Sequence, residues 1–443
     1  MHNYDVIVIG AGIAGASTAC AMAARGWNTL LLDRHSFPRH KVCGEFLSPE
    51  SARSLASLGL AHVLAQQTPP PPSIERIRLA AALGKPLELR LHTPAQSISR
   101  YALDDALQQE ARRCGAEVRT GVTVRGMVRA ADGWRVRIRS REQGETELAA
   151  RVVIGAWGRN APAEWMEAGA EAEAPPINDV VKGRGGDGEP DRLRVGAGAF
   201  RRGGLGRQDK QPSNRQIDWR GRVIGGGSGN DGESNRRSKR LLGVRMLLSG
   251  VPAEPVVELF FFRGGYLGLV PAGDGTANAA ALVTPEAWAA AGQSTAAVLA
   301  AAAQQVPALA RRLRDAQPVA GTAAAAPVVL TRVPRAWGIV PHVGDAASVI
   351  PPLCGDGMAM GLHAAALCAP LADQYLHGTL SLSEWRMAYT EALQRDFAGP
   401  LRWGLRLQAG LGSRVLSLLL LGLGRLAPSM AYRLVEATRL QLH

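Results

Sequence analysis

The distribution of apolar residues at the start of the chain predicts two buried strands joined by a helix. Residues 5–9, "DVIVI", form an apolar run without alternation, which is typical of a parallel strand covered on both faces. A glycine-rich turn and a helical run of small residues follow, and a second apolar run ends at Asp33. This order predicts an α/β class with a Rossmann-like parallel sheet that binds a dinucleotide.

Three glycines stand between the first strand and the helix. Gly10 is expected to make the tight turn, Gly12 to let the backbone approach a pyrophosphate, and Gly15 to let the helix pack closely on the strand. Asp33, at the end of the second strand, can accept hydrogen bonds from an adenosine ribose. These residues alone leave both NAD and FAD open as the nucleotide.

Later apolar runs predict a second, mixed sheet and a helical tail. The segment near residues 74–91 and the runs "RLLGVRMLLSG" and "PVVELFFFRGGYLGLVP" have the pattern of strands, and helices are expected near residues 285–314. From residue 378 on, leucines recur at helical spacing with interspersed arginines. This tail either forms a layer packed on the second, mixed-sheet domain or lies on a membrane surface.

Composition places the chain among globular proteins with one unusual segment. The chain has 443 residues, 46% of them hydrophobic, and a net charge of +13. Much of this positive charge lies in residues 181–240, which contain fifteen Lys and Arg and seven Asp and Glu. Residues 167–240 are predicted to be a low-complexity basic insertion, disordered because they cannot form a core. No nucleic-acid partner is therefore expected, and an RNA-associated protein that uses the insertion is a distant alternative.

The cysteines and the N-terminus bear on location. The five cysteines show no metal-ligand spacing and are an odd number for a disulfide framework, so no metal site is predicted; they are Cys20, Cys43, Cys114, Cys354 and Cys368. Cys20, Cys114 and Cys368 are expected in the core.

The N-terminus lacks the basic leading region of an export signal, and no apolar run is long enough for a membrane span. A cytoplasmic protein, with a peripheral membrane contact through its C-terminal helices as an option, is expected.

Three segments together resemble a known superfamily. They are the opening glycine motif with the following "RHSFPRHKVCGEFLSPES", the segment "SRYALDDALQQEARRCGAEVRTGVTV", and the late turn "GDAASVIPPLCGDGMAMGL". In this order they resemble the flavoproteins that include para-hydroxybenzoate hydroxylase-type monooxygenases and geranylgeranyl reductases. The resemblance covers roughly residues 1–160 and 240–380.

The resemblance implies a noncovalent, extended FAD held at both ends. It implies that Arg100 reaches the phosphates, Val124 lies beside the adenine, Asp345 binds a ribityl hydroxyl, and the late turn offers backbone N–H groups to the flavin. The implied cofactor-binding residues are Gly10, Gly12, Ala14, Gly15, Asp33, Arg34, Cys43, Gly44, Arg100, Val124, Gly344, Asp345, Gly355, Gly357 and Met358. Cys43 and Tyr266 are the candidates for a catalytic role.

The resemblance also implies interleaved domains. The predicted FAD-binding domain comprises residues 1–70, 97–160 and 328–377, and the predicted substrate domain comprises residues 71–96 and 241–327. Residues 378–443 form the predicted C-terminal helical region.

The chain departs from the superfamily pattern at two places. Trp157 replaces an acid that the hydroxylases commonly carry, and Gly268 replaces the tryptophan that the reductases place over the flavin. There is no second glycine motif, so NAD(P)H is expected to bind transiently as electron donor, unless a separate reductase supplies the electrons. The halogenase motif is absent as well.

These observations favour one reaction over another. Because Gly268 leaves space over the flavin, the leading hypothesis is a monooxygenase that hydroxylates a hydrophobic aromatic or polyketide-type substrate through a flavin hydroperoxide. The alternative is a reductase of isoprenoid or lipid double bonds. Both reactions require the same cofactor and a hydrophobic small-molecule substrate.

Overall fold

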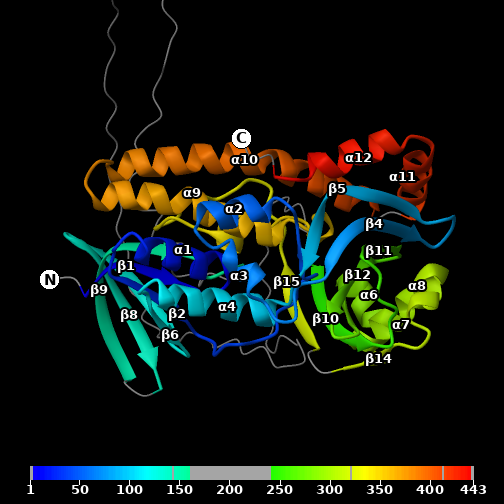
Figure 1. Cartoon of the computed structure of the whole chain (residues 1–443), viewed down its shortest axis with the longest axis horizontal. Coiled ribbons are helices and arrows are strands. Elements are labelled where there is room, and N and C mark those ends of the chain that lie inside the picture. Colours follow the sequence, from blue (N-terminus) through cyan, green and yellow to red (C-terminus); the bar gives the residue numbers. More distant parts are fainter. Residues whose placement is uncertain (1–2, 142–143, 160–240, 320–321, 412–413, 441–443) are drawn as a thin grey trace, which may run out of the picture. The chain divides into compact units, whose positions relative to one another are not determined.

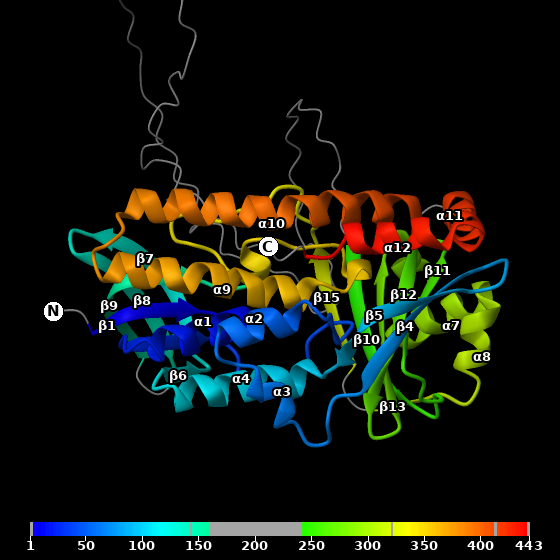
Figure 2. The ribbon, with the colours of Figure 1, turned by 45° about the horizontal axis from the view of Figure 1, so that its top comes forward.

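The computed structural model describes residues 3–141, 144–159, 241–319, 322–411 and 414–440 (Figures 1 and 2). The predicted basic insertion, residues 167–240, lies outside the described residues.

A six-stranded sheet, counted over the described residues, holds the opening motif. Its strand order is β6-β2-β1-β9-β8-β7, and the first four of these strands run parallel. The strands are β1 (Tyr4–Ile9), β2 (Thr29–Asp33), β6 (Glu117–Thr120), β7 (Thr123–Ala130), β8 (Gly133–Ser140) and β9 (Gly144–Gly155). Helix α1 (Ile13–Ala23) packs against both α4 (Arg100–Arg113) and α9 (Gly357–Leu376), which are far apart in the sequence. We call this sheet A.

A second, mixed sheet lies beside sheet A (Figure 2), and we call it sheet B. Its order is β14-β10-β13-β12-β11-β4-β5-β3, with β15 also on β10, and only the β4–β11 pair is parallel. The strands are β3 (Phe46–Leu47), β4 (Ser73–Ala81), β5 (Leu87–Ser97), β10 (Leu241–Ser249), β11 (Val256–Phe262), β12 (Gly265–Gly273), β13 (Thr276–Val283), β14 (Gln317–Pro318) and β15 (Ala323–Val328). The short helices α6 (Pro285–Ala290), α7 (Thr295–Gln305) and α8 (Pro307–Arg312) pack by it.

The remaining helices cover both sheets. The long helix α10 (Leu382–Leu411) packs along α9, whereas α11 (Arg414–Leu426) contacts β4, β5 and β11, and α12 (Pro428–Ala437) packs on α10 and α11 (Figure 1). Two short helices, α2 (Ser51–Ser57) and α3 (His62–Ala65), lie nearer the N-terminus. Within the described residues no single helix has the length and hydropathy of a membrane span, although α11 and α12 together pass that test as a bent pair.

The predicted fold class is confirmed: a parallel α/β sheet, a mixed sheet and C-terminal helices are all present. Two details differ from the sequence-based picture. Phe46 and Leu47 fall in the predicted FAD-binding segment but pair with β5 of sheet B. The first helix of the tail, α10, packs against α9 rather than against sheet B. The predicted domain boundaries stay a prediction.

A buried ion pair connects the loop after β2 to sheet B. Arg245 on β10 donates from Nη2 to Oε2 of Glu45 at 3.0 Å, and both side chains are 1% exposed. Nε of the same arginine donates to Oδ1 of Asn278 at 2.7 Å, and the Asn278 amide donates to the carbonyl of Cys43 at 3.0 Å. The loop that contains Cys43 is therefore fixed to strands β10 and β13.

Loss of this pair should destabilise the protein far more than loss of an exposed one. Arg245→Ala leaves the Glu45 carboxylate buried without its charged partner, and we expect it to lower the free energy of unfolding by about 3–5 kcal/mol. Arg76→Ala, which removes an exposed partner of Glu88, should cost less than about 1 kcal/mol. Urea denaturation of both variants measures the difference, and equal losses would contradict this account.

Candidate functional site

One cavity of about 940 Å³ is lined by residues of both sheets and of the C-terminal helices. Every residue that the sequence singled out lies on its wall: Gly10, Gly12, Ala14, Gly15, Asp33, Arg34, Cys43, Gly44, Arg100, Val124, Tyr266, Gly344, Asp345, Gly355, Gly357 and Met358. These residues come from segments more than three hundred positions apart, and the fold brings them to one space.

The glycine turn has the geometry that close packing requires. Gly10 has φ +110°, and a Cβ there would collide with the carbonyl of Ala156. A Cβ on Gly15 would collide with the carbonyl of Gly10. Larger residues are therefore excluded at both positions, so the start of α1 lies against the end of β1.

The N-terminus of α1 faces a cluster of cations. A Cβ on Gly12, the residue before α1, would stand 3.0 Å from Nζ of Lys41 and 3.7 Å from Nη2 of Arg100. Both cations bind the buried Asp104, at 2.6 Å from Lys41 and at 2.8 and 3.0 Å from Arg100. Two positive side chains share one carboxylate beside free helix N–H groups, so the cluster has a net charge that suits a phosphate group.

The protonation of this cluster follows from burial and pairing. Burial alone raises the pKa of Asp104, but Arg100 and Lys41 outweigh it and hold that pKa below its usual range. Burial lowers the pKa of Lys41. Arg39 also lines the cavity, and its buried Nε has no hydrogen-bond partner within the described residues. Lys41 and Arg39 were not among the residues predicted to bind the cofactor. The only signal for them in the sequence is the number of basic residues in "RHSFPRHK".

Asp33 stands at the same end of the cavity. Its Oδ2 accepts from the backbone N–H of Ala11 at 2.8 Å, and its Oδ1 accepts from the N–H of His35 at 2.8 Å. The acid thus supports the glycine turn itself and still lines the cavity, where its side chain can accept from a ribose hydroxyl.

The late segment reaches the cavity next to α1. A Cβ on Gly344 would stand 2.8 Å from Cβ of Ala14, so glycine is needed for this approach. Gly355 adopts φ +78°, and helix α9 begins two residues later, at Gly357. No side chain caps the first N–H groups of α9. Two open helix N-termini, those of α1 and α9, therefore face one cavity.

The far wall of the cavity is apolar. It contains side chains from sheet B and from the C-terminal helices, namely Leu79, Leu87, Leu89, Phe261, Leu411, Leu421, Leu434 and Val435. Gly268 lies on this wall, and a Cβ there would make only ordinary contacts, 3.4 Å from Leu259 and 3.7 Å from the carbonyl of Ala280. The position is open to a larger side chain.

The two catalytic candidates are both neutral groups. Burial raises the pKa of the Tyr266 phenol well above its usual value, and burial raises the pKa of the Cys43 thiol. The Cys43 sulfur accepts from the N–H of Glu45 at 3.4 Å. Neither group is placed to act as an anion, and their catalytic role stays a prediction. Trp157 also lines the cavity, with its ring edge against His342 at 5.1 Å between centroids.

These residues fit an FAD whose pyrophosphate and flavin ring bind at two helix N-termini. Gly12, Lys41 and Arg100 form a cradle that a side chain at position 12 would fill, which suits a pyrophosphate. Gly355, Gly357 and the start of α9 offer backbone N–H groups at the other end. The cavity links the two.

Comparisons with known proteins agree with this geometry. Residues 3–173 match the family model of the FAD binding domain. A menaquinone reductase of Mycobacterium tuberculosis is 32% identical over 126 residues, 27% of this chain and 29% of that protein. The squalene epoxidase ERG1 of Gibberella zeae is 43% identical over 61 residues, 14% of this chain and 12% of that protein. The aligned parts thus span less than a third of either relative's length.

Two solved structures share the fold across nearly the whole chain. The flavin-dependent brominase Bmp2 is 15% identical with a TM-score of 0.69, and covers 99% of this chain and 93% of its own. A geranylgeranyl bacteriochlorophyll reductase-like protein of Thermoplasma acidophilum is 16% identical with a TM-score of 0.64, and covers 93% of this chain and 88% of its own. At these identities the likeness concerns the fold alone.

Residues 3–173 match an FAD binding domain, and the fold across nearly the whole chain is shared with solved FAD-dependent proteins. The cofactor of this chain is FAD, and the resemblance to the superfamily of para-hydroxybenzoate hydroxylase-type monooxygenases and geranylgeranyl reductases is confirmed.

Removal of the Lys41 charge should weaken FAD binding without unfolding the protein. In Lys41→Met, Arg100 still neutralises Asp104, but one cation beside the α1 N-terminus is lost. We expect the dissociation constant of FAD to rise about tenfold or more, because a charge-assisted hydrogen bond contributes about 1.5–3 kcal/mol. Flavin fluorescence on titration measures it. The exposed Lys85→Met is the control, and equal affinities in the two variants would refute the assignment.

Asp356, the residue before α9, should make stability depend on pH. Burial raises its pKa to about 7, although Nη1 of Arg439 lies 3.1 Å from its Oδ1. Between the usual value of 3.8 and about 7, the folded protein holds a proton that the unfolded chain has lost, so stability falls as the pH rises through this window.

The variant Asp356→Asn removes this titration. From about pH 5 to about pH 8, the wild type should lose about 2–3 kcal/mol of unfolding free energy relative to Asp356→Asn. Denaturation curves across this range measure the difference, and parallel pH profiles for the two proteins would be inconsistent with a raised pKa.

Proposed function

We propose that this chain is an FAD-dependent monooxygenase that acts on a hydrophobic substrate. The observation that carries the proposal is the single cavity that joins the cationic N-terminus of α1 to the apolar wall of sheet B. A nucleotide with a charged pyrophosphate and a planar redox ring spans such a cavity, and an apolar substrate fits the wall that remains. A site of this kind also excludes water.

Each part of the cavity has a distinct task in this proposal. Lys41 and Arg100 hold the phosphates, and the α9 N-terminus stabilises negative charge at the redox end through fixed backbone dipoles. When bound, FAD supplies the oxidation–reduction chemistry with electrons from NAD(P)H. The neutral Tyr266 phenol and Cys43 thiol contribute hydrogen bonding and packing beside the substrate.

The space at Gly268 supports oxygenation of a bulky molecule. A glycine on the wall of sheet B leaves room that the reductase pattern fills with tryptophan, and a Cβ at this position would make ordinary contacts without a clash. A predicted aromatic or polyketide-type substrate is compatible with this room. The similarity over 61 residues to a protein named squalene epoxidase supports an apolar substrate as well.

A second candidate is a reductase of isoprenoid or lipid double bonds. The observation that favours it is the similarity to a menaquinone reductase over 126 residues. The apolar wall formed by β4, β5 and α11 suits an isoprenoid chain equally well. The two candidates differ in whether oxygen enters the product.

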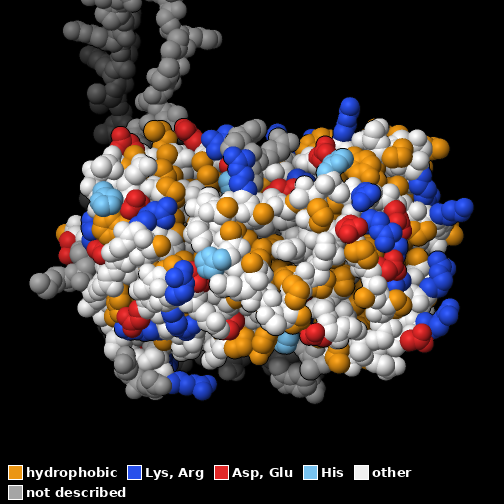
Figure 3. Space-filling model, viewed as in Figure 1, with side chains coloured by type: hydrophobic (Ala, Val, Ile, Leu, Met, Phe, Trp, Pro, Cys, Tyr) orange, Lys and Arg blue, Asp and Glu red, His pale blue; other side chains and the backbone are white. Residues whose placement is uncertain are grey.

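Two further predictions are connected with this proposal. A peripheral membrane contact stays a prediction, and its place would be α11 and α12, where Leu419, Leu423, Leu426 and Met430 are exposed. Figure 3 shows hydrophobic side chains at the surface of this end of the molecule. A cytoplasmic location also stays a prediction. RNA association through the basic insertion concerns residues outside the described ones.

Labelled oxygen distinguishes the two reactions. The holoprotein is supplied with NADPH or NADH, ¹⁸O₂, and a panel of hydrophobic phenols, aromatic polyketides and isoprenoid quinones, and products are weighed by mass spectrometry. One labelled oxygen atom per product molecule is expected. Anaerobic turnover of an isoprenoid alkene to an unlabelled, saturated product would overturn the proposal.

The variant Gly268→Trp tests the role of the open space. We expect kcat/KM for a bulky substrate to fall at least about tenfold, with FAD content unchanged, because the indole occupies substrate space rather than cofactor space. Gly268→Ala is the matched control and should change little. If the tryptophan variant oxygenates the same substrate at the wild-type rate, the substrate does not bind over Gly268.

A further inference from the structure

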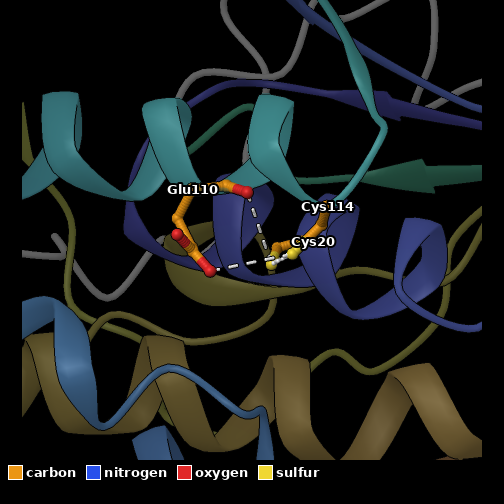
Figure 4. A group of neighbouring side chains, drawn as sticks. All are labelled: Cys20, Glu110 and Cys114. Carbon is orange, nitrogen blue, oxygen red and sulfur yellow. Dashed lines mark hydrogen bonds between the residues drawn. The ribbon is translucent and has the colours of Figure 1, made fainter.

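Two cysteines that are distant in the sequence lie side by side away from the cavity wall. Cys20 is on α1 and Cys114 directly follows α4, and their sulfur atoms are 2.6 Å apart (Figure 4). Glu110, one turn before Cys114, completes the group. Its Oε1 lies 3.9 Å from the sulfur of Cys114, and its backbone carbonyl oxygen lies 3.9 Å from the sulfur of Cys20.

The spacing of the sulfur atoms selects one kind of chemistry. Two thiolates bound to one tetrahedral zinc ion, each at about 2.3 Å from the metal, would stand roughly 3.7 Å apart, so 2.6 Å is too close for a shared metal. A disulfide bond of about 2.05 Å needs only a small approach of the two side chains. We propose that Cys20 and Cys114 form a reversible disulfide that joins α1 to α4.

The two thiols differ in reactivity. Cys20 is 2% exposed, and burial raises its pKa well above the usual value, whereas Cys114 is only partly buried. The Glu110 carboxylate next to Cys114 is held by Arg113, and these hydrogen bonds lower the pKa of Glu110 to about 2. Cys114 is the more accessible of the two thiols, so it meets a dissolved oxidant first.

The oxidant is a hydroperoxide, of which hydrogen peroxide is the simplest. The Cys114 sulfur attacks one peroxide oxygen, the O–O bond breaks, and a sulfenic acid and one water result. The Cys20 sulfur then attacks the sulfenyl sulfur, the S–O bond breaks, the S–S bond forms, and a second water leaves. Two thiols lose two electrons and two protons, and the peroxide is reduced to two waters.

The bond would fasten two helices whose other ends serve the cofactor. The N-terminus of α1 follows Gly12 and that of α4 begins at Arg100, and both face the cation cluster of the cavity. The disulfide closes at the opposite ends of these helices. It therefore stabilises the arrangement of α1 on α4 without occupying the site, and it does not depend on which reaction the enzyme catalyses.

Peptide mapping tests the bond directly. The holoprotein is treated with hydrogen peroxide, alkylated under denaturing conditions, and digested with trypsin, which releases residues 1–25 and 114–119. We expect a crosslinked pair of these two peptides that dithiothreitol separates. Alkylation of both cysteines after peroxide treatment, or a crosslink of either one to Cys43, Cys354 or Cys368, would overturn the proposal. Protection of both from alkylation by added zinc in the reduced protein would overturn it in favour of a metal.

A stability measurement tests the consequence. The oxidised wild type should melt about 5 °C above the reduced wild type, because the crosslink restricts the unfolded chain. The variants Cys20→Ala and Cys114→Ser should show no such difference between oxidised and reduced samples. A confirmed crosslink without any change in melting temperature would contradict the stabilising role.

Discussion

The ion pair between Arg245 and Glu45 determines where the two halves of the site stand. It is fully buried, so a missing partner would leave an uncompensated charge, and it joins the loop after β2 to β10 of sheet B. The other oxygen of Glu45 accepts from the backbone N–H of Arg100 at 3.1 Å, which positions the first residue of α4. One carboxylate thereby fixes the cationic loop, the α4 N-terminus and the mixed sheet relative to one another.

The helix N-termini explain why such distant segments are needed. In the proposed binding mode, the pyrophosphate binds at the N-terminus of α1 and the flavin at that of α9, because one helix start does not reach both groups. The contact between Ala14 and Gly344 brings the late segment that precedes α9 against the start of α1, and only a residue without a side chain at 344 allows it. The apolar wall of sheet B then encloses the remaining space.

The local parts of this design could be read from the sequence. Gly10, Gly12 and Gly15 occupy a strand-to-helix turn whose spacing defines its geometry, and the apolar runs on both sides identify the strand and helix. The long-range parts could not be read in the same way. No periodicity shows which cation of the 34–41 loop turns inward, and Arg245 and Glu45 are two hundred positions apart. Cys20 and Cys114 were assigned to the core from helical patterns, whereas their proximity depends on how α1 packs on α4.

We expect a single FAD to bind at the N-termini of both α1 and α9. Hydrogen exchange of the protein with and without FAD, read by mass spectrometry, tests this binding mode. FAD should slow exchange in the segments around Gly12 and around Gly357 together, with little change in α7 and α8. Protection at the first segment with none at the second would contradict it.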